Sequence, residues 1–316
     1  MNQSQREWNV LISAPYLLPV IGQYRSFLEQ NGVNIITVPV NERLDEAELL
    51  KIIDQVEGVI CGDDHFTRRV IESSPHLKVI SKWGTGIDSI DLNAASQQGV
   101  KVYNTADAFT DPVADTVMGY VLIFARQLLA LDRNMRNGAW QKLPAVSLRE
   151  CVLGIVGLGN VGLAVARRAG AFGMSVLGND VADISDVTAQ AYNVEKASLN
   201  RILVESDFVS LNCNLNPTSD HLISEKEFRV MKTSAYLINT SRGRVVSQDA
   251  LVKALQQEWI AGAALDVFEN EPMTSDNPLL KYENCLLAPH NANSSPVAWE
   301  KVHESTINNL IEGLNS

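Results

Sequence analysis

Three short polar segments could carry out chemistry, because each directly follows an apolar stretch typical of a strand. They are residues 239–246, which contain Arg242, residues 266–272, which contain Glu271, and residues 286–293, which contain His290. Ligands of open α/β sheets bind beyond the carboxyl ends of the strands, so these side chains can converge on one site. An imidazole can exchange a proton near neutral pH, a carboxylate can orient it, and a guanidinium can hold a carboxylate ligand. Taken singly, a structural histidine, a solvated arginine and a turn glutamate explain the same residues.

A glycine-rich turn earlier in the chain predicts a dinucleotide site. Gly157, Gly159 and Gly162 follow an apolar strand in the order G-x-G-x-x-G, and a helix is expected to begin near Asn160. Glycines here allow a tight turn and a close approach of the backbone to a pyrophosphate, and the helix start adds N–H groups and a positive dipole end. The alternative is an ordinary strand–helix connection whose glycines only permit close packing.

Asp180 ends the next apolar strand, residues 174–177. Its separation in sequence from the glycines is about that of the acidic residue that binds both ribose hydroxyls in dinucleotide-binding folds. A carboxylate repels a 2′-phosphate, so the residue favours NAD over NADP unless a nearby arginine overrides it.

The composition is that of an ordinary globular protein, with 316 residues, 46% hydrophobic and 20% charged. The length allows two domains. The net charge of −11 argues against nucleic acid and anionic membranes as partners. No apolar run approaches a membrane span, and residues 1–7 lack the pattern of a signal peptide. The four cysteines are isolated, which predicts reduced thiols, no metal site and a cytoplasmic protein.

Strand-like and helix-like segments alternate along the chain, which predicts parallel sheets covered by helices. In the first part, strands are expected at residues 10–13, 33–38, 58–61, 77–81 and 100–103, and helices at 20–30, 46–56 and 68–73. Pro112 opens one long expected helix, residues 113–135. After the glycine-rich strand that starts at residue 151, strands are expected at 174–177, 207–211, 235–239, 261–265 and 285–288, and helices at 199–204, 225–231, 248–257 and 296–314.

Five ordered blocks resemble the D-isomer-specific 2-hydroxyacid dehydrogenases, close in style to the phosphoglycerate dehydrogenase branch. They are Gly84-Thr85-Gly86-Ile87-Asp88, the glycine-rich turn, N-x-S-R-G from residue 239, D-V-F-x-x-E-P from residue 266, and Pro289-His290. The resemblance spans nearly the whole chain. It implies an α/β protein of two doubly wound parallel-sheet domains. A Rossmann-type NAD-binding domain, residues 108–293, would be inserted into a flavodoxin-like substrate domain, residues 1–107 and 294–316.

The resemblance also implies a reaction and roles. The family transfers a hydride between NAD and C2 of a D-2-hydroxy acid or 2-oxo acid. His290 would be the base, or the acid in the reverse direction, and Glu271 would orient its imidazole. Arg242 would bind the substrate carboxylate and polarise the C2 oxygen. Thr85 and Gly86 would cradle that carboxylate with backbone N–H groups, whereas a tight turn without a ligand is the alternative.

Further cofactor contacts are implied around the glycine-rich turn and Asp180. They are Asn160, Val161, Asn214, Leu215, Thr116, Thr240 and Asp266. Asp266 could instead merely end a strand. In the family, the region of residues 113–135 exchanges contacts across a two-fold homodimer, and a buried helix of a monomer is the alternative.

The chain departs from the phosphoglycerate dehydrogenase pattern. After the third expected strand, where that branch has Arg-Ser for the substrate phosphate, this chain has Cys61-Gly62, followed by Asp63 and Asp64. Two carboxylates would repel a phosphate, which argues against 3-phosphoglycerate. Lys82 could offset them, but is more simply interpreted as a surface lysine. Residues 291–293 read Asn-Ala-Asn instead of Ile-Gly-Gly, which predicts a more polar pocket near the nicotinamide and substrate. Residues 212–216 lack the family's histidine, so the cofactor contacts of that segment depart from the family pattern.

The residues, taken with this resemblance, favour an NAD-dependent oxidoreductase that acts on a 2-hydroxy or 2-oxo acid. Phosphoglycerate dehydrogenase proper is one alternative. Another is a redox sensor, because some relatives are corepressors that bind NAD(H), and turnover would separate the two. Formate dehydrogenases of this fold carry Gln at the position of Glu271, which argues against formate.

Overall fold

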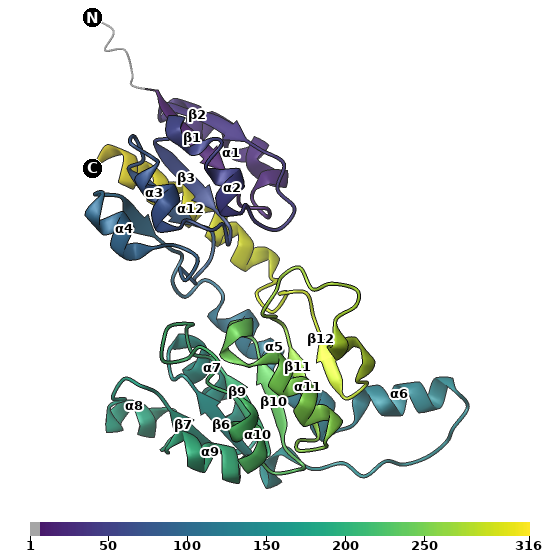
Figure 1. Cartoon of the computed structure of the whole chain (residues 1–316). Coiled ribbons are helices and arrows are strands. Elements are labelled where there is room, and N and C mark those ends of the chain that lie inside the picture. Colours follow the sequence, from purple (N-terminus) through teal and green to yellow (C-terminus); the bar gives the residue numbers. More distant parts are fainter. Residues whose placement is uncertain (1–6) are drawn as a thin grey trace, which may run out of the picture. The chain divides into compact units, whose positions relative to one another are not determined.

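The computed structural model describes residues 7–316, so the stretch searched for a signal peptide lies almost wholly outside the described residues. The chain divides into two compact units (Figure 1). Unit 1 contains the residues up to Phe109 together with Ser295–Ser316, and unit 2 contains Thr110–Ser294. Each unit is built on a parallel sheet, so the carboxyl ends of its strands meet at one edge.

The sheet of unit 1 has five strands in the order β2-β1-β3-β4-β5, which is the flavodoxin-like order. Its strands are β1 (Trp8–Ile12), β2 (Val33–Thr37), β3 (Gly58–Cys61), β4 (Val79–Lys82) and β5 (Lys101–Tyr103). Its helices are α1 (Ile21–Gln30), α2 (Glu46–Leu49), α3 (Arg68–Glu72), α4 (Leu92–Gln97) and α12 (Pro296–Asn315). Every residue of β3 and β4 is buried, as expected for central strands covered on both faces.

Helix α12 joins unit 1 from the far end of the sequence and packs on β3 and β4. Two glycines permit this approach, since a Cβ on Gly58 would lie 2.9 Å from Leu310 and a Cβ on Gly313 would collide with Val79. The Ser81 hydroxyl donates to the carbonyl of Thr306 at 2.8 Å. The last helix is therefore part of the core of unit 1.

The sheet of unit 2 has seven strands in the order β12-β11-β10-β9-β6-β7-β8, a Rossmann order extended by one strand. Its strands are β6 (Val152–Val156), β7 (Ser175–Asn179), β8 (Glu195–Lys196), β9 (Phe208–Leu211), β10 (Tyr236–Asn239), β11 (Gly262–Leu265) and β12 (Cys285–Leu287). Its helices are α5 (Thr110–Ala125), α6 (Leu128–Arg136), α7 (Asn160–Ala171), α8 (Asp186–Ala191), α9 (Leu199–Glu205), α10 (Glu225–Val230) and α11 (Gln248–Gln256).

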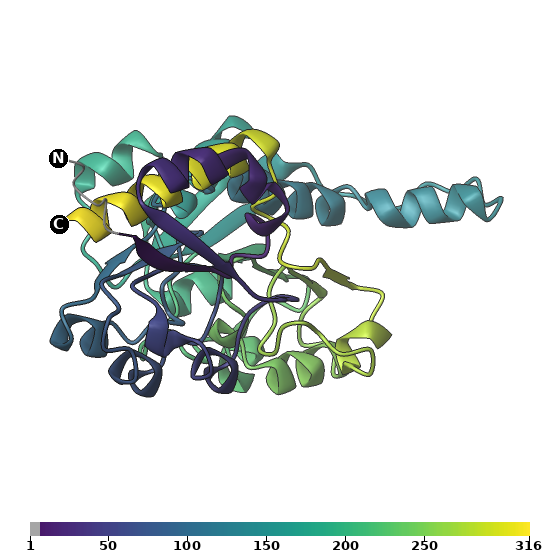
Figure 2. The same cartoon turned by 90° about the horizontal axis from the view of Figure 1, so that it is seen from above.

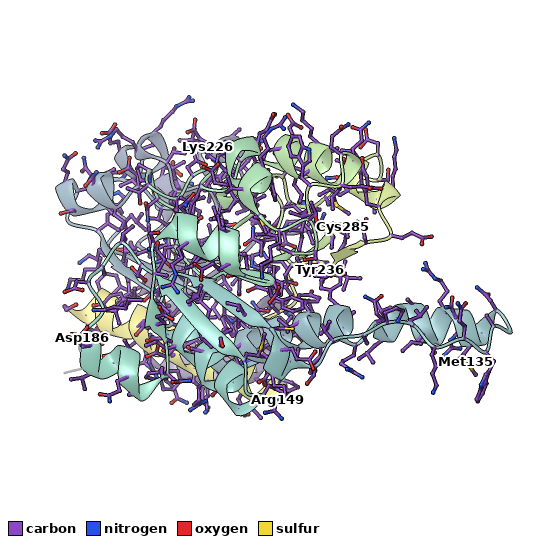
Figure 3. All side chains as sticks on the ribbon, turned by 90° about the horizontal axis from the view of Figure 1, so that it is seen from below. Met135, Arg149, Asp186, Lys226, Tyr236 and Cys285 are labelled. Carbon is purple, nitrogen blue, oxygen red and sulfur yellow. The ribbon has the colours of Figure 1, made fainter. Side chains whose placement is uncertain are left out.

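The prediction of one helix over residues 113–135 is wrong. Gln127 adopts a left-handed backbone with a φ of 56°, which a right-handed helix cannot continue through, so α5 ends before it and α6 begins after it. Helix α5 contributes six buried residues to the core, whereas α6 contributes none. Helix α6 projects from the rest of unit 2, with Met135 near its end (Figures 2 and 3).

Other short elements also differ from the prediction. The helix expected at residues 46–56 is α2 followed by a 3-10 turn, Ile53–Gln55, because Ile52 has a non-helical φ of −129°. Helices α4 and α8 and strand β8 have no counterpart among the predicted elements. Their residues are mostly exposed, so they carry little hydrophobic periodicity.

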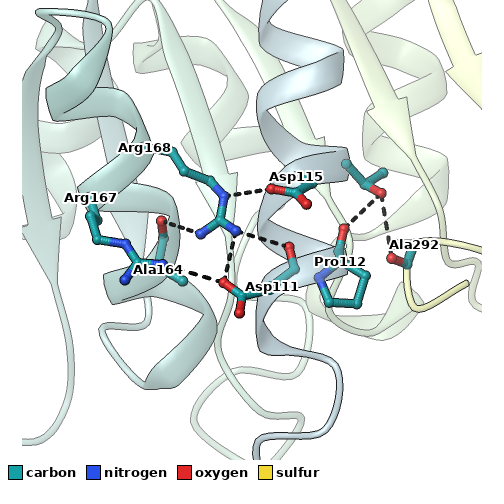
Figure 4. Close-up of polar contacts among 8 residues, drawn as sticks. Asp111, Pro112, Asp115, Ala164, Arg167, Arg168 and Ala292 are labelled. Atoms are coloured by element: carbon teal, nitrogen blue, oxygen red, sulfur yellow. Dashed lines mark hydrogen bonds and ion pairs between the residues drawn. The ribbon is translucent and has the colours of Figure 1, made fainter. Parts of the chain in front are cut away.

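Two salt-bridged aspartates fix α5 against α7 (Figure 4). The guanidinium of Arg168 donates to Asp111 at 2.8 Å and to Asp115 at 2.6 Å. Arg168 itself is largely shielded from solvent, with 20% of its side chain exposed. The start of α5, where the chain enters unit 2, is thereby anchored to the helix that follows the glycine-rich turn.

Among residues 7–316, no single helix has the length and apolar composition of a membrane span. The pair α5 and α6 passes that test only when both halves are counted together, and they meet at a bend of 57°. The described residues also hold no group of three or more His, Cys, Asp or Glu side chains placed to bind a metal ion.

Candidate active site

The three polar segments that were expected to converge follow neighbouring strands of unit 2. Arg242 comes after β10, Glu271 after β11 and His290 after β12, and these strands are adjacent in the sheet. Because the strands are parallel, all three segments leave the same edge.

Glu271 and His290 form a hydrogen-bonded pair at this edge. The His290 Nδ1 lies 3.0 Å from Glu271 Oε2, and Glu271 Oε1 accepts the backbone N–H of Phe268 at 2.8 Å. A carboxylate that accepts this hydrogen bond places the hydrogen on Nδ1, so Nε2 is the nitrogen that can exchange a proton with a substrate. The two side chains are 23% and 17% exposed, which leaves the imidazole accessible to a small molecule.

Asp266 holds the backbone of the loop that carries His290. Its two carboxylate oxygens accept the N–H groups of Asn291 and Ala292, each at 2.8 Å, and its carbonyl accepts the N–H of His290 at 2.7 Å. Burial raises the pKa of Asp266, while those two N–H groups and His290 act in the opposite direction. His290 has a φ of 51°, a conformation that this bonded loop maintains.

Arg242 follows a turn that the buried side chain of Asn239 stabilises. Asn239 Nδ2 donates to the carbonyl of Arg242 at 2.9 Å, and Asn239 Oδ1 accepts the N–H of Ser241 at 3.1 Å. A Cβ at Gly243 would collide with the backbone of Phe268. Because Gly243 has no side chain, the turn that carries Arg242 can pack directly against the segment that holds Glu271.

The glycine-rich turn has the close contacts that require glycine. Gly157 has a φ of 95°, and a Cβ there would collide with the backbone of Asn212 and Cys213. A Cβ at Gly162 would collide with the carbonyl of Gly157. Gly159 is the N-cap of α7 and supplies no side-chain cap, so the N–H groups of Asn160 and its neighbours are left open to an anion.

Asp180 links the second strand to this turn. Its Oδ2 accepts the N–H of Leu158 at 2.6 Å, and its Oδ1 accepts the N–H of Ala182 at 2.8 Å. A carboxylate has about four lone-pair sites, so the side chain can still accept ribose hydroxyls.

Comparisons with known proteins identify the family. Residues 118–292 match the model of the D-isomer specific 2-hydroxyacid dehydrogenase, NAD binding domain. The sequence is 40% identical to a glyoxylate reductase of Thermofilum pendens, over 84% of this chain and 80% of that protein. The chain belongs to the D-isomer-specific 2-hydroxyacid dehydrogenase family. A D-3-phosphoglycerate dehydrogenase of Methanocaldococcus jannaschii is 37% identical over 86% of this chain, but this chain covers 53% of that protein.

Solved structures share the fold of this dehydrogenase. A D-lactate dehydrogenase from Aquifex aeolicus, complexed with NAD and lactic acid, matches with a TM-score of 0.85 and 26% identity, over 95% of this chain and 93% of that one. A glyoxylate reductase from Paecilomyes thermophila matches with a TM-score of 0.85 and 26% identity, over 98% of this chain and 96% of that one. The predicted fold, the NAD cofactor and hydride transfer between NAD and a 2-hydroxy or 2-oxo acid are confirmed.

The residues at the sheet edge of the dehydrogenase fit a dinucleotide. Asn212 Oδ1, after β9, and Thr240 Oγ1, after β10, are buried and have no hydrogen-bond partner among residues 7–316. A buried polar atom left without a partner costs free energy, which a bound polar ligand relieves. The sequence indicated Thr240 but not Asn212, whose only signal is its position directly after a strand.

Other predicted cofactor residues lie close by in unit 2. Val161 is in the first turn of α7, and Leu215 packs against the hydrophobic core. The carbonyl of Asn214 accepts the Ser219 hydroxyl at 2.6 Å. The Thr116 hydroxyl on α5 donates to the carbonyl of Pro112 at 3.1 Å and lies 3.4 Å from that of Ala292, in the loop after His290.

Thr85 and Gly86 lie in unit 1, in the loop after β4. The Thr85 hydroxyl donates to the carbonyl of Thr105 at 3.3 Å, and the Thr85 carbonyl accepts from Asn104 Nδ2 at 2.7 Å. The interpretation of the preceding Lys82 as a surface lysine is wrong. Only 4% of its side chain is exposed, because its Nζ pairs with Asp63 Oδ1 at 2.9 Å inside the unit.

Proposed function

We propose that this dehydrogenase works as a reductase of small 2-oxo acids, of the size of glyoxylate, with NADH as hydride donor. The observation that carries the proposal is the Glu271–His290 pair beside the Arg242 turn. The relatives from Thermofilum pendens and Korarchaeum cryptofilum, 40% and 42% identical, are named glyoxylate reductases.

The proposed roles follow from the hydrogen bonds. His290 Nε2 holds the proton that the C2 oxygen takes up during reduction, and Glu271 keeps the imidazole in the tautomer and direction that this requires. Arg242 binds the substrate carboxylate with its planar fork and stabilises charge on the C2 oxygen. When bound, NAD supplies the hydride chemistry at C2.

We propose the following cofactor contacts. The turn from Gly157 to Gly162, with Asn160 and Val161, binds the pyrophosphate, and Asp180 binds the ribose hydroxyls. Thr240 and Asn212 offer the polar atoms that lack partners. Thr116, Asn214, Leu215 and Asp266 line the same region. Asp266 acts mainly by holding the His290 loop, since both its carboxylate oxygens are engaged there.

Unit 1 is proposed as the substrate domain. Thr85 and Gly86 lie in its loop after β4, where the Thr85 hydroxyl and carbonyl are already used within the unit, and we propose that the loop offers its backbone N–H groups to a ligand. Backbone N–H groups in such a loop form an anion-binding concavity. We propose that they hold the substrate carboxylate.

A substrate panel tests the function. Glyoxylate, hydroxypyruvate, pyruvate and phosphohydroxypyruvate are each supplied with NADH or NADPH, and the loss of reduced cofactor is followed by absorbance. We expect the highest kcat/KM for a small, singly charged 2-oxo acid with NADH. A preference for phosphohydroxypyruvate would indicate a phosphoglycerate dehydrogenase, and tight NADH binding without turnover would indicate a sensor.

We also propose a homodimer formed through α6. Leu128, Leu129 and Met135 are 48%, 52% and 51% exposed, and Trp140 in the following loop is 90% exposed. Apolar side chains gathered on a projecting segment are typical of an interface.

We expect a mass of about twice 34.7 kDa in light scattering, and we expect Leu129→Glu to weaken association. Leu92→Glu, at a leucine of α4 that is 45% exposed, is the control, and a monomeric wild type contradicts the proposal.

The proposed compartment is the cytoplasm. All four cysteines within residues 7–316 are free, and Cys61, Cys151 and Cys285 are buried. Unpaired thiols are usual where the environment is reducing. Recovery of the protein in a secreted or periplasmic fraction would contradict this assignment.

A further inference from the structure

An ion pair between a buried lysine and a partly exposed aspartate lies at the base of the loop that carries Thr85 and Gly86. Lys82 is the last residue of β4, and its ammonium lies 2.9 Å from Asp63 Oδ1 in the loop after the neighbouring strand β3. The lysine side chain is 4% exposed and that of Asp63 is 32% exposed. Asp63 is therefore the member of the pair that a molecule arriving from solvent meets first.

The loop that presents Asp63 is held in place by the next residue. Asp64 is fully buried, accepts the N–H of Leu44 at 2.7 Å and accepts a hydrogen bond from the Ser13 hydroxyl. Burial raises the pKa of Asp64 to about 6, although both hydrogen bonds favour its charged form. These contacts hold the backbone next to Asp63, and its carboxylate is paired with the Lys82 ammonium.

The Lys82 ammonium also contacts the substrate loop itself. It lies 3.4 Å from the carbonyl of Trp83, and a Cβ added at Gly84 would lie 3.6 Å from it. The Trp83 indole donates to His303 Nδ1 at 2.9 Å, which ties this loop to α12. The positive charge is thus directly beneath the segment whose N–H groups would hold a carboxylate.

We propose that Asp63 is a specificity-determining residue that, by pairing with Lys82, restricts the enzyme to substrates with a single negative charge. This inference rests on the proposed function, because it takes the loop at residues 84–86 as the carboxylate site. One carboxylate is satisfied by the backbone N–H groups. A second anionic group would need the Lys82 ammonium, which Asp63 already neutralises, and would meet the Asp63 carboxylate at close range.

The test compares two inhibitors that differ in one charged group. Lactate carries one carboxylate, and tartronate carries a second carboxylate in place of the methyl group. Each inhibition constant is measured against NADH-dependent reduction of the best singly charged substrate. The ratio of the two constants cancels any difference in the fraction of active enzyme.

We expect Asp63→Asn to strengthen tartronate inhibition relative to lactate by about tenfold or more, because the buried ammonium loses its counter-charge. Lys82→Met should weaken tartronate relative to lactate, and the double variant should return close to the wild-type ratio. Glu72→Gln, which removes the same charge from an exposed 3.0 Å pair with Arg68 in unit 1, should leave the ratio within about twofold.

The outcomes separate this inference from the proposed function. If Asp63→Asn does not fold, the opposite shift in Lys82→Met still tests the pair. A ratio that none of the variants changes overturns the role of Asp63, while turnover of the substrate leaves the proposed function standing. Absence of turnover for every 2-oxo acid in the wild type contradicts the proposed function and, with it, this inference.

Discussion

Replacing His290 by glutamine is expected to lower kcat/KM by about 10²–10⁴-fold, the contribution typical of a positioned acid–base residue. Glutamine keeps a polar side chain that can still contact Glu271, but it has no group that exchanges a proton near neutral pH. The side chain is 23% exposed, so the loss of packing is small and the protein should remain folded. Steady-state reduction of the 2-oxo acid, with NADH binding followed by fluorescence, measures the effect.

His221 provides a matched control for this variant. Its Nε2 also pairs with a carboxylate, Glu269 Oε1, at 3.1 Å, but it follows a different segment and is 48% exposed. His221→Gln should therefore leave kcat/KM close to the wild-type value. If both glutamine variants behave alike, or if His290→Gln turns over normally, His290 is not the acid–base residue.

Replacing Arg242 by glutamine is expected to lower kcat/KM by about 10²–10³-fold, as for the loss of a donor to a developing negative charge. Both KM and kcat should change, because the guanidinium is proposed to hold the carboxylate and also to stabilise the C2 oxygen. Arg242→Lys keeps the charge but loses the planar fork, so it should recover only part of the activity.

Arg244 is the control for this second variant. It lies two residues further on and pairs with Asp220 at 2.6 Å, with 56% of its side chain exposed. Arg244→Gln should affect kcat/KM little, since exposed pairs contribute little free energy. Equal losses in the two glutamine variants would show that any charge removed from this segment has the same effect, and would contradict a specific role for Arg242.

The sequence was most informative where function depends on local backbone chemistry. The glycines at 157, 159 and 162 and the polar segments after β10, β11 and β12 could be recognised because their signals lie within a few residues of one another. Parallel pairing then places those segments at one edge, which the general rule for open α/β sheets anticipates.

Features that depend on distant residues could not be recognised in the same way. From the sequence alone, a lysine is interpreted as a surface residue. Lys82 is paired with Asp63 and buried only because β3 and β4 lie side by side in the folded sheet. The role of Asp266 depends on a loop 25 residues away in sequence. The break between α5 and α6 rests on one left-handed residue, Gln127, for which the apolar pattern of the segment gives no warning.

The placement of α12 has a consequence for how the protein is made. Unit 2 is encoded by one continuous stretch, so it can fold as soon as that stretch has left the ribosome. The β-strands of unit 1 are synthesised before unit 2, yet the face formed by Gly58 and Val79 stays uncovered until α12 emerges. The sheet of unit 1 can therefore mature only after the whole of unit 2 has been translated, although its strands precede unit 2 in the sequence.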